Sequence, residues 1–173
     1  MSNYIKKICF YGPESTGKSV FSQQMASLYN TAYVPEVARE MLITNNFSRE
    51  DIIAIGKAQT ERVFEKVKTA NKILCCDTDL ITTQIYARIY LNEVPPVLYE
   101  LEKQVAYDLY FLFDIDVPWV ADGLRDLGHR REEMFMLFKR ELEIRNISYI
   151  LVQGSIAARE KIITQAIDRL IDR

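Results

Sequence analysis

Short apolar runs alternate with longer segments of mixed polarity along this chain. The runs are rich in β-branched and aromatic residues, which is typical of strands, and they cover residues 5–11, 33–35, 72–76, 109–113 and 149–152. The segments between them predict helices over residues 18–29, 36–42, 49–70, 82–91, 96–107, 132–146 and 156–171. Because the strands are mostly continuous apolar runs that alternate with helices, the pattern indicates a parallel sheet covered on both faces.

The composition is that of a globular protein with balanced charge. The chain has 173 residues, 49% of them hydrophobic, and a formal net charge of −2. This length predicts a single domain over residues 1–173, and the balanced charge disfavours a nucleic-acid binder with a basic face. No apolar stretch is long enough for a membrane span, and the N-terminus lacks the pattern of a signal peptide. Cys9, Cys75 and Cys76 lie in apolar runs, which predicts reduced core thiols in a cytoplasmic protein.

A phosphate-binding motif follows the first predicted strand. The segment GPESTGKS, residues 12–19, matches G-x-x-x-x-G-K-[ST] in full and leads directly into a predicted helix. In such a loop the backbone N–H groups and the helix N-terminus hold phosphate oxygens, Lys18 reaches the β- and γ-phosphates, and Ser19 ligates Mg²⁺. The motif predicts ATP and Mg²⁺ as cofactors. The predicted ATP-binding residues are Gly12, Glu14, Ser15, Thr16, Gly17, Lys18, Ser19 and Val20.

Two aspartates follow the third predicted strand. Asp77 ends that strand, where an acid can hold a Mg²⁺-bound water. Asp79 lies just beyond it and is either a catalytic acid or the N-cap of the next helix. Thr78 occupies the position where a hydrolytic motor usually has a second acid. The segment therefore favours transfer of the phosphate to a substrate hydroxyl over transfer to water.

An acid and an arginine follow the second predicted strand. If Pro35 opens a helix, Glu36 and Arg39 share one face of it. Glu36 could then accept a proton from a sugar hydroxyl that Arg39 helps to orient. A solvated ion pair between the two side chains is the alternative, and the sequence leaves both open.

The segment of residues 120–132 is polar and rich in arginine, and we predict that it forms a lid. Arginines on a mobile loop, here Arg125 and Arg130, can close over phosphates and offset the charge that develops during transfer. A solvated basic loop is the alternative. Trp119, just before this segment, could stack on a planar ring or anchor a hinge.

Taken in order, these motifs resemble the ribosylnicotinamide kinase domains of the NadR type and their stand-alone relatives. The resemblance is carried by GPESTGKS, VPEVARE, the glycine and glutamine of Gly56-Lys-Ala-Gln59, DTDLITTQ and YDLYFLFDIDVPWVADGLR. It implies a three-layer α/β P-loop fold of the nucleoside and nucleotide kinase type, with a five-stranded parallel sheet. It also implies that the chain lacks the adenylyltransferase activity of NadR, because it begins at the kinase strand.

The implied reaction is the ATP-dependent phosphorylation of nicotinamide riboside at its 5′-hydroxyl, which yields nicotinamide mononucleotide. The resemblance implies that Lys18 and Ser19 bind ATP and Mg²⁺ and that Asp77 binds the metal. It also implies that the riboside is bound by Glu36, Arg39, Trp119 and Asp122. The alternatives are a kinase for another nucleoside-like or vitamin substrate and a regulatory ATP-binding protein with slow hydrolysis. The oligomeric state is left open.

Overall fold

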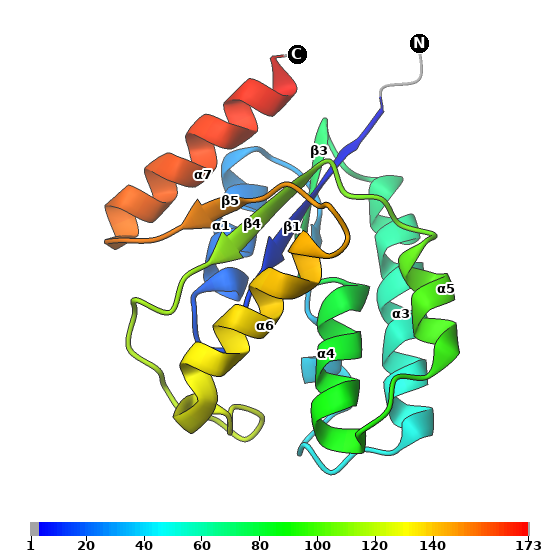
Figure 1. Ribbon diagram of the computed structural model, residues 1–173. Coiled ribbons are helices and arrows are strands. Elements are labelled where there is room, and N and C mark those ends of the chain that lie inside the picture. The colour runs from blue at the N-terminus through cyan, green and yellow to red at the C-terminus, as the bar shows by residue number, and fades with distance from the viewer. Residues whose placement is uncertain (1–3, 173) are drawn as a thin grey trace.

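The central sheet consists of five parallel strands in the part of the chain that the structure, a computed structural model, describes, residues 4–172. The strands are β1 (Lys6–Tyr11), β2 (Tyr33–Val34), β3 (Ile73–Asp77), β4 (Leu109–Phe113) and β5 (Ile150–Val152). Their order in the sheet is β2-β3-β1-β4-β5. Figure 1 labels β3, β1, β4 and β5. The predicted fold class is confirmed, and each strand lies within about two residues of its predicted bounds.

Seven α-helices connect or follow these strands within residues 4–172. They are α1 (Lys18–Leu28), α2 (Val37–Met41), α3 (Arg49–Val67), α4 (Leu80–Leu91), α5 (Pro96–Glu102), α6 (Arg131–Glu143) and α7 (Ile156–Ile171). A short 3₁₀ turn, Gly128–Arg130, precedes α6. Among these residues no helix has both the length and the apolar character needed to cross a membrane.

One predicted helix is wrong at its C-terminal end. The sequence predicts helix as far as residue 107, whereas α5 ends at Glu102. Beyond it Val105 is buried beside β3, in a cluster with Leu74 and Cys76. Burial of this side chain at the sheet outweighs the local preference for helix, because tertiary packing overrides weak propensities.

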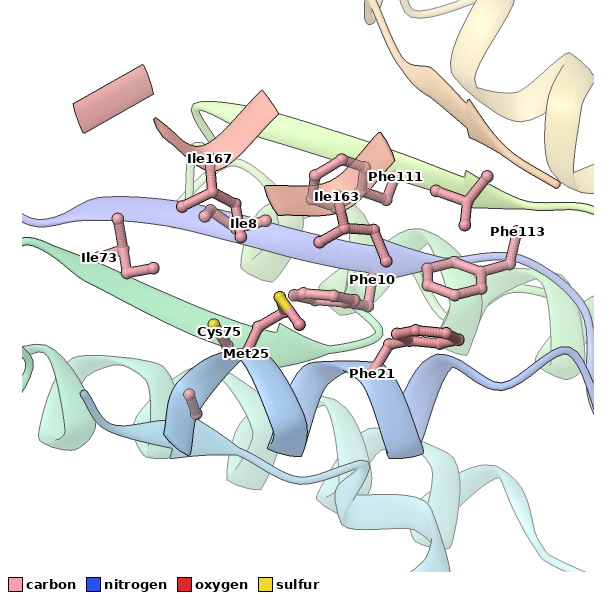
Figure 2. Packing of buried hydrophobic residues seen from close by; sticks show 12 residues of the cluster. Ile8, Phe10, Phe21, Met25, Ile73, Cys75, Phe111, Phe113, Ile163 and Ile167 are labelled. Atoms are coloured by element: carbon pink, nitrogen blue, oxygen red, sulfur yellow. The ribbon is translucent and has the colours of Figure 1, made fainter. Parts of the chain in front are cut away.

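Two layers of helices cover the sheet. On one face, α1 and α7 pack on the alternate strand residues that point toward them. Figure 2 shows Phe10, Phe21 and Phe113 gathered over α1, with Ile163 and Ile167 reaching in from α7. The ring centroids of Phe21 and Phe113 are 5.9 Å apart, within the range of favourable aromatic pairs.

The opposite face of the sheet is covered by α3, α4 and α6, with α5 packed on the outside of α3 and α4 (Figure 1). Here the strand residues of the other parity are buried, Cys9 and Cys76 among them. All three cysteines are free and buried, as predicted, and burial raises their thiol pKa values. Since the thiolate is the reactive form, these cysteines are packing residues and not nucleophiles.

Strand register brings the chemistry-bearing segments together. β1 and β3 are adjacent, and Phe10 lies opposite Asp77. The loop after β1 therefore lies beside the carboxylate that ends β3. This is the carboxyl edge of the sheet, where ligands of open parallel sheets bind.

Candidate active site

The loop between β1 and α1 has the backbone geometry that the phosphate-binding motif requires. Gly12 has a φ of 141°, and a Cβ placed on it would lie 2.9 Å from the backbone oxygen of Phe113. Gly17 has a φ of 92° and is the N-cap of α1. Only glycine adopts these conformations without strain, so both glycines are dictated by the turn. All eight predicted ATP-binding residues line one pocket at the sheet edge.

Lys18 is buried at the start of α1, and its ammonium donates to the backbone oxygen of Pro13 at 2.6 Å. Burial lowers the pKa of Lys18, while the nearby charges of Glu36 and Asp77 act in the opposite direction. Within residues 4–172 no carboxylate forms an ion pair with this ammonium. Its positive charge is thus available to an anion in the pocket, which is what a phosphate requires.

Ser19 and Asp77 form the polar pair next to Lys18. The Ser19 hydroxyl donates to Oδ2 of Asp77 at 2.5 Å. The other oxygen of the Asp77 carboxylate, Oδ1, is buried and has no hydrogen-bond partner among the described residues. Burial, followed by the charge of Glu36, raises the pKa of Asp77 to about 6. A hydroxyl beside an unsatisfied carboxylate oxygen fits the oxygen ligands of Mg²⁺, which spreads and neutralises phosphate charge when bound.

Asp79 has the capping role that the sequence left as an alternative. One oxygen of its carboxylate accepts from the backbone N–H and the hydroxyl of Thr82, and the other accepts from the Tyr110 hydroxyl at 2.8 Å. It is buried, and burial raises its pKa to about 6. Asp79 is not among the residues that line the pocket. The interpretation of Asp79 as a catalytic acid is therefore replaced by that of a helix N-cap.

Replacing Asp79 with alanine is expected to lower the free energy of unfolding by about 2 kcal/mol. The change removes an N-cap, worth about 0.5–2 kcal/mol, and leaves the buried Tyr110 hydroxyl without its acceptor. Denaturant-induced unfolding measures the loss. Tyr110→Phe keeps the cap and should cost less, and equal losses for the two variants would contradict the capping role.

Thr78, between the two aspartates, has an unfavourable backbone conformation. Its φ is 72°, in the left-handed region that β-branched residues rarely adopt. Its N–H donates to the backbone oxygen of Phe10 at 3.0 Å, and the residue lines the pocket. Backbone strain of this kind persists only where the surrounding structure imposes it, and it concentrates at functional sites. Nothing in the sequence indicates this conformation.

Glu36 and Arg39 lie on the same side of the pocket. Glu36 is the N-cap residue of α2, and its carboxylate is 3.2 Å from Nε of Arg39. Arg39 also forms a 2.9 Å ion pair with Asp122, from the predicted lid. Glu36 and Arg39 line the same pocket as Lys18 and Ser19, so the structure brings the two predicted groups together. Asp122, which pairs with Arg39, is not itself a lining residue of the pocket.

Aromatic side chains form a wall of this pocket that sequence reasoning missed. Tyr86 and Tyr90 are four residues apart on α4, and their rings stack with centroids 6.2 Å apart. Phe47 meets Tyr90 edge-on at 5.5 Å. Ile52 and Ile55 of α3 continue the apolar lining. The i, i+4 spacing of the two tyrosines is a detectable signal, but it does not show which helix face lines a cavity.

The predicted lid, residues 120–132, contacts the phosphate-binding loop. The backbone N–H of Val120 donates to the Ser15 hydroxyl at 2.8 Å. The N–H of Leu127 donates to the Glu14 carboxylate at 2.6 Å. These two contacts hold the segment against the loop at its first residue and at Leu127.

The same segment also contacts residues outside the phosphate-binding loop that line the pocket. The Asn45 amide donates to the backbone oxygen of Leu124 at 2.8 Å. Tyr90 donates to Asp126, and Asp122 pairs with Arg39. The segment therefore lies across both halves of the pocket.

The arginines of the predicted lid, Arg125, Arg130 and Arg131, have different environments. Arg125 lines the pocket and is 3.2 Å from Asp122. Arg130 pairs with Glu133 at 2.6 Å and does not line the pocket, so its predicted place above the phosphates is not observed. Arg131, which was not among the predicted site residues, donates to the backbone oxygen of Ser15 at 3.1 Å.

Trp119 packs inside the predicted lid. A Cβ placed on Gly128 would lie 2.7 Å from the Trp119 ring, so the indole covers that glycine. Trp119 is not a lining residue of the pocket. Of the two roles left open by the sequence, the structure favours the anchor over the stacking platform.

Arg159 of α7 is hydrogen-bonded to the phosphate-binding loop. This side chain is 1% exposed, although it carries a full charge. It donates to the backbone oxygens of Thr16 at 2.9 Å and Gly154 at 3.0 Å, and it pairs with Asp116. Because a buried charge must be paired and hydrogen-bonded, this arginine fixes the loop relative to α7. It lies on the last helix, far from the motif in sequence, and no local pattern points to it.

Comparison with known proteins agrees with this geometry. The protein family described as AAA domain (AAA_28) matches residues 7–159. The chain belongs to this family. The trifunctional NAD biosynthesis/regulator protein NadR of Escherichia coli (strain K12) is 33% identical to this AAA-domain chain over 160 residues, or 87% of the chain and 38% of the relative. NadR of Salmonella typhimurium is 32% identical over 160 residues, which again cover 87% of the chain and 38% of the relative. The chain thus spans less than half the length of these relatives.

Solved structures show the same fold as this AAA-domain chain. A NadR protein in complex with NAD and AMP-PNP superposes with a TM-score of 0.82 at 19% identity, over 98% of the chain and 50% of that protein. A deoxyadenosine kinase from M. mycoides gives a TM-score of 0.67 at 12% identity, over 94% of the chain and 99% of that protein. The fold is that of the P-loop kinases, and the resemblance to NadR is confirmed.

Proposed function

We propose that this chain is an ATP-dependent kinase that phosphorylates the 5′-hydroxyl of nicotinamide riboside and forms nicotinamide mononucleotide. One observation carries the proposal: a single pocket is lined by the phosphate-binding loop, by the aromatic side chains Phe47, Tyr86 and Tyr90, and by Glu36. The relatives give support, because NadR structures contain an ATP analogue together with NAD in one case and NR in another. The whole activity would reside in one domain of residues 1–173.

In the proposed reaction the 5′-oxygen of the riboside attacks the γ-phosphorus of ATP. The bond from that phosphorus to the β–γ bridging oxygen breaks, and ADP leaves. Glu36 accepts the proton of the attacking hydroxyl, and Arg39 orients the Glu36 carboxylate from 3.2 Å. Lys18 and Arg125 supply positive charge where the transferred phosphoryl group develops negative charge.

The aromatic wall fits a flat, positively charged ring. The pyridinium ring of nicotinamide riboside carries one positive charge, and tyrosine faces attract cations through their ring quadrupoles. Tyr86 and Tyr90 line the pocket together with Phe47. An uncharged nucleoside would gain stacking here but not the cation–π attraction, so the wall favours the pyridinium riboside.

Asp77 and Ser19 would hold the Mg²⁺ that accompanies ATP. Asp77→Asn keeps the size of the side chain but removes the charge, so we expect a weaker dependence of activity on Mg²⁺ and low turnover. ATP binding measured without metal should hardly change. Mg²⁺ titrations of the parent and the variant provide the measurement, and coinciding curves would make Asp77 a structural residue.

Product analysis tests the proposed function directly. The protein is incubated with ATP, Mg²⁺ and a panel that contains nicotinamide riboside, purine and pyrimidine ribosides and a vitamin alcohol. We expect nicotinamide mononucleotide and ADP in equal amounts, with little ADP formed when no acceptor is present. Phosphorylation of another riboside alone would keep the kinase and reject the substrate. ADP formation that is independent of any acceptor would favour a regulatory nucleotide-binding protein.

A further inference from the structure

Gln59 is a buried amide that has only one of its two ends satisfied by the protein. It lies on α3, is 2% exposed and lines the pocket. Its Oε1 accepts from the backbone N–H of Val37 at 3.0 Å. Its Nε2 has no hydrogen-bond partner among residues 4–172. A buried N–H group without an acceptor is costly, so a ligand that supplies the acceptor would be favoured.

The orientation of this amide is fixed by its surroundings. Val37 is the first residue of α2, and its N–H can only donate, so the oxygen of Gln59 must face it. The NH₂ group is thereby directed away from α2. The backbone of α3 is held as well, since a Cβ on Gly56 would lie 2.6 Å from Leu98 of α5. Gln59 is thus a preorganised donor.

The neighbours of Gln59 indicate which part of a substrate it meets. Ile52, Ile55 and Gln59 are three and four residues apart, so they share one face of α3. This face lines the pocket together with Phe47, Tyr86 and Tyr90. Apolar and aromatic surfaces suit a flat ring, whereas sugar hydroxyls, which donate as well as accept, suit the charged pair of Glu36 and Arg39.

We propose that Gln59 is a specificity-determining residue whose Nε2 donates a hydrogen bond to a carbonyl-type oxygen on the ring of the acceptor riboside. The assignment rests on the proposed function, in which that oxygen belongs to the carboxamide of nicotinamide riboside. A site built around a buried donor discriminates strongly against an analogue that lacks the acceptor, because the donor is then left unpaired.

Three ribosides and two substitutions test the assignment. The ribosides carry a carboxamide, a carboxylate or no substituent on the pyridinium ring. Gln59→Met removes the amide, and Gln59→Glu removes the donor but keeps an oxygen for the N–H of Val37. Gln104→Met, on an exposed position outside the pocket, is the matched control. The measurements are kcat/KM for each riboside at saturating Mg-ATP and the affinity for AMP-PNP.

With Gln59→Met we expect kcat/KM to fall about ten- to a hundredfold for the two substituted ribosides and hardly at all for the unsubstituted one. With Gln59→Glu the carboxylate riboside should lose more than the carboxamide riboside, because only the carboxamide can turn its NH₂ toward the new acceptor. AMP-PNP affinity should stay at the parental value in both variants.

Three outcomes would overturn the assignment. Equal losses for all three ribosides would make Gln59 a support of α2, and no loss would show that the amide meets no substrate. A loss that disappears with a 2′-deoxyriboside but persists without the ring substituent would place the donor on the sugar. If the parent phosphorylates only a different riboside, the proposed function fails. The same variants are then compared on that riboside with and without its ring carbonyl, and only a loss confined to the carbonyl form retains the assignment.

Discussion

Glu36→Gln is expected to lower the turnover number about a hundred- to ten-thousandfold with nicotinamide riboside as acceptor, the range typical of a positioned general base. The substitution keeps the size of the side chain and a hydrogen-bonding partner for Arg39, 3.2 Å away. It removes the negative charge and the ability to accept the hydroxyl proton. The apparent affinity for ATP should hardly change, because the proposed reaction has Glu36 act on the acceptor and not on ATP. Steady-state kinetics with the riboside varied at saturating Mg-ATP provide the measurement.

Glu40→Gln is the matched control for this experiment. Glu40 is on the same helix, α2, but pairs with Arg62 at 3.0 Å and does not line the pocket. Its substitution should leave turnover at the parental level. Arg39→Ala should mainly raise the KM for the riboside, since an orienting contact is lost. Parental turnover of Glu36→Gln would show that the base is elsewhere.

Lys18→Ala is expected to lower turnover at least about a hundredfold, because in the proposed reaction the lysine supplies positive charge to the transferred phosphoryl group. The fold should be unaffected. Burial lowers the pKa of this ammonium, so its charge does not stabilise the folded protein. The only hydrogen bond described for it goes to Pro13 within the same loop. Turnover is compared with the unfolding midpoint of the same preparation.

Lys57→Ala, at an exposed position of α3, controls for the loss of one surface charge. It should change neither quantity. Near-parental turnover in Lys18→Ala would mean that the loop of residues 12–19 does not hold the transferred phosphate. A large drop in the unfolding midpoint would instead give Lys18 a structural role.

The fold could be predicted from the sequence because its strands are apolar on both faces, which leaves few alternatives to a covered parallel sheet. Local signals also mark helix starts: Ser48 and Asp51 form a capping box at the start of α3, and the Ser155 side chain caps α7. The end of α5 could not be predicted, since it depends on Val105 being buried beside β3. Local patterns define where elements exist, and tertiary packing decides where they stop.

The candidate site also has one part that the sequence predicts and one part that it does not. The phosphate-binding loop is contiguous, so its motif contains both the residues and their geometry. Tyr86 and Tyr90, Gln59, and Arg159 come from three different helices. The tyrosines and Gln59 reach the pocket, and Arg159 reaches the phosphate-binding loop, only in the folded chain. Trp119 and Arg130 were placed toward the substrate, but the path of a loop decides which way its side chains face. Sequence spacing carries no information on that path.

The hydrogen bonds and ion pairs that hold the predicted lid are made by partly exposed groups. Arg39 and Asp122, for example, keep 34% and 35% of their side-chain surface in contact with solvent. Ion pairs of this kind contribute about 0–1 kcal/mol each, an amount comparable to thermal energy. We therefore expect the predicted lid to open at a small cost in free energy, and added salt should favour opening by screening the charges. Ligands could then enter and leave many times without any disturbance of the core below.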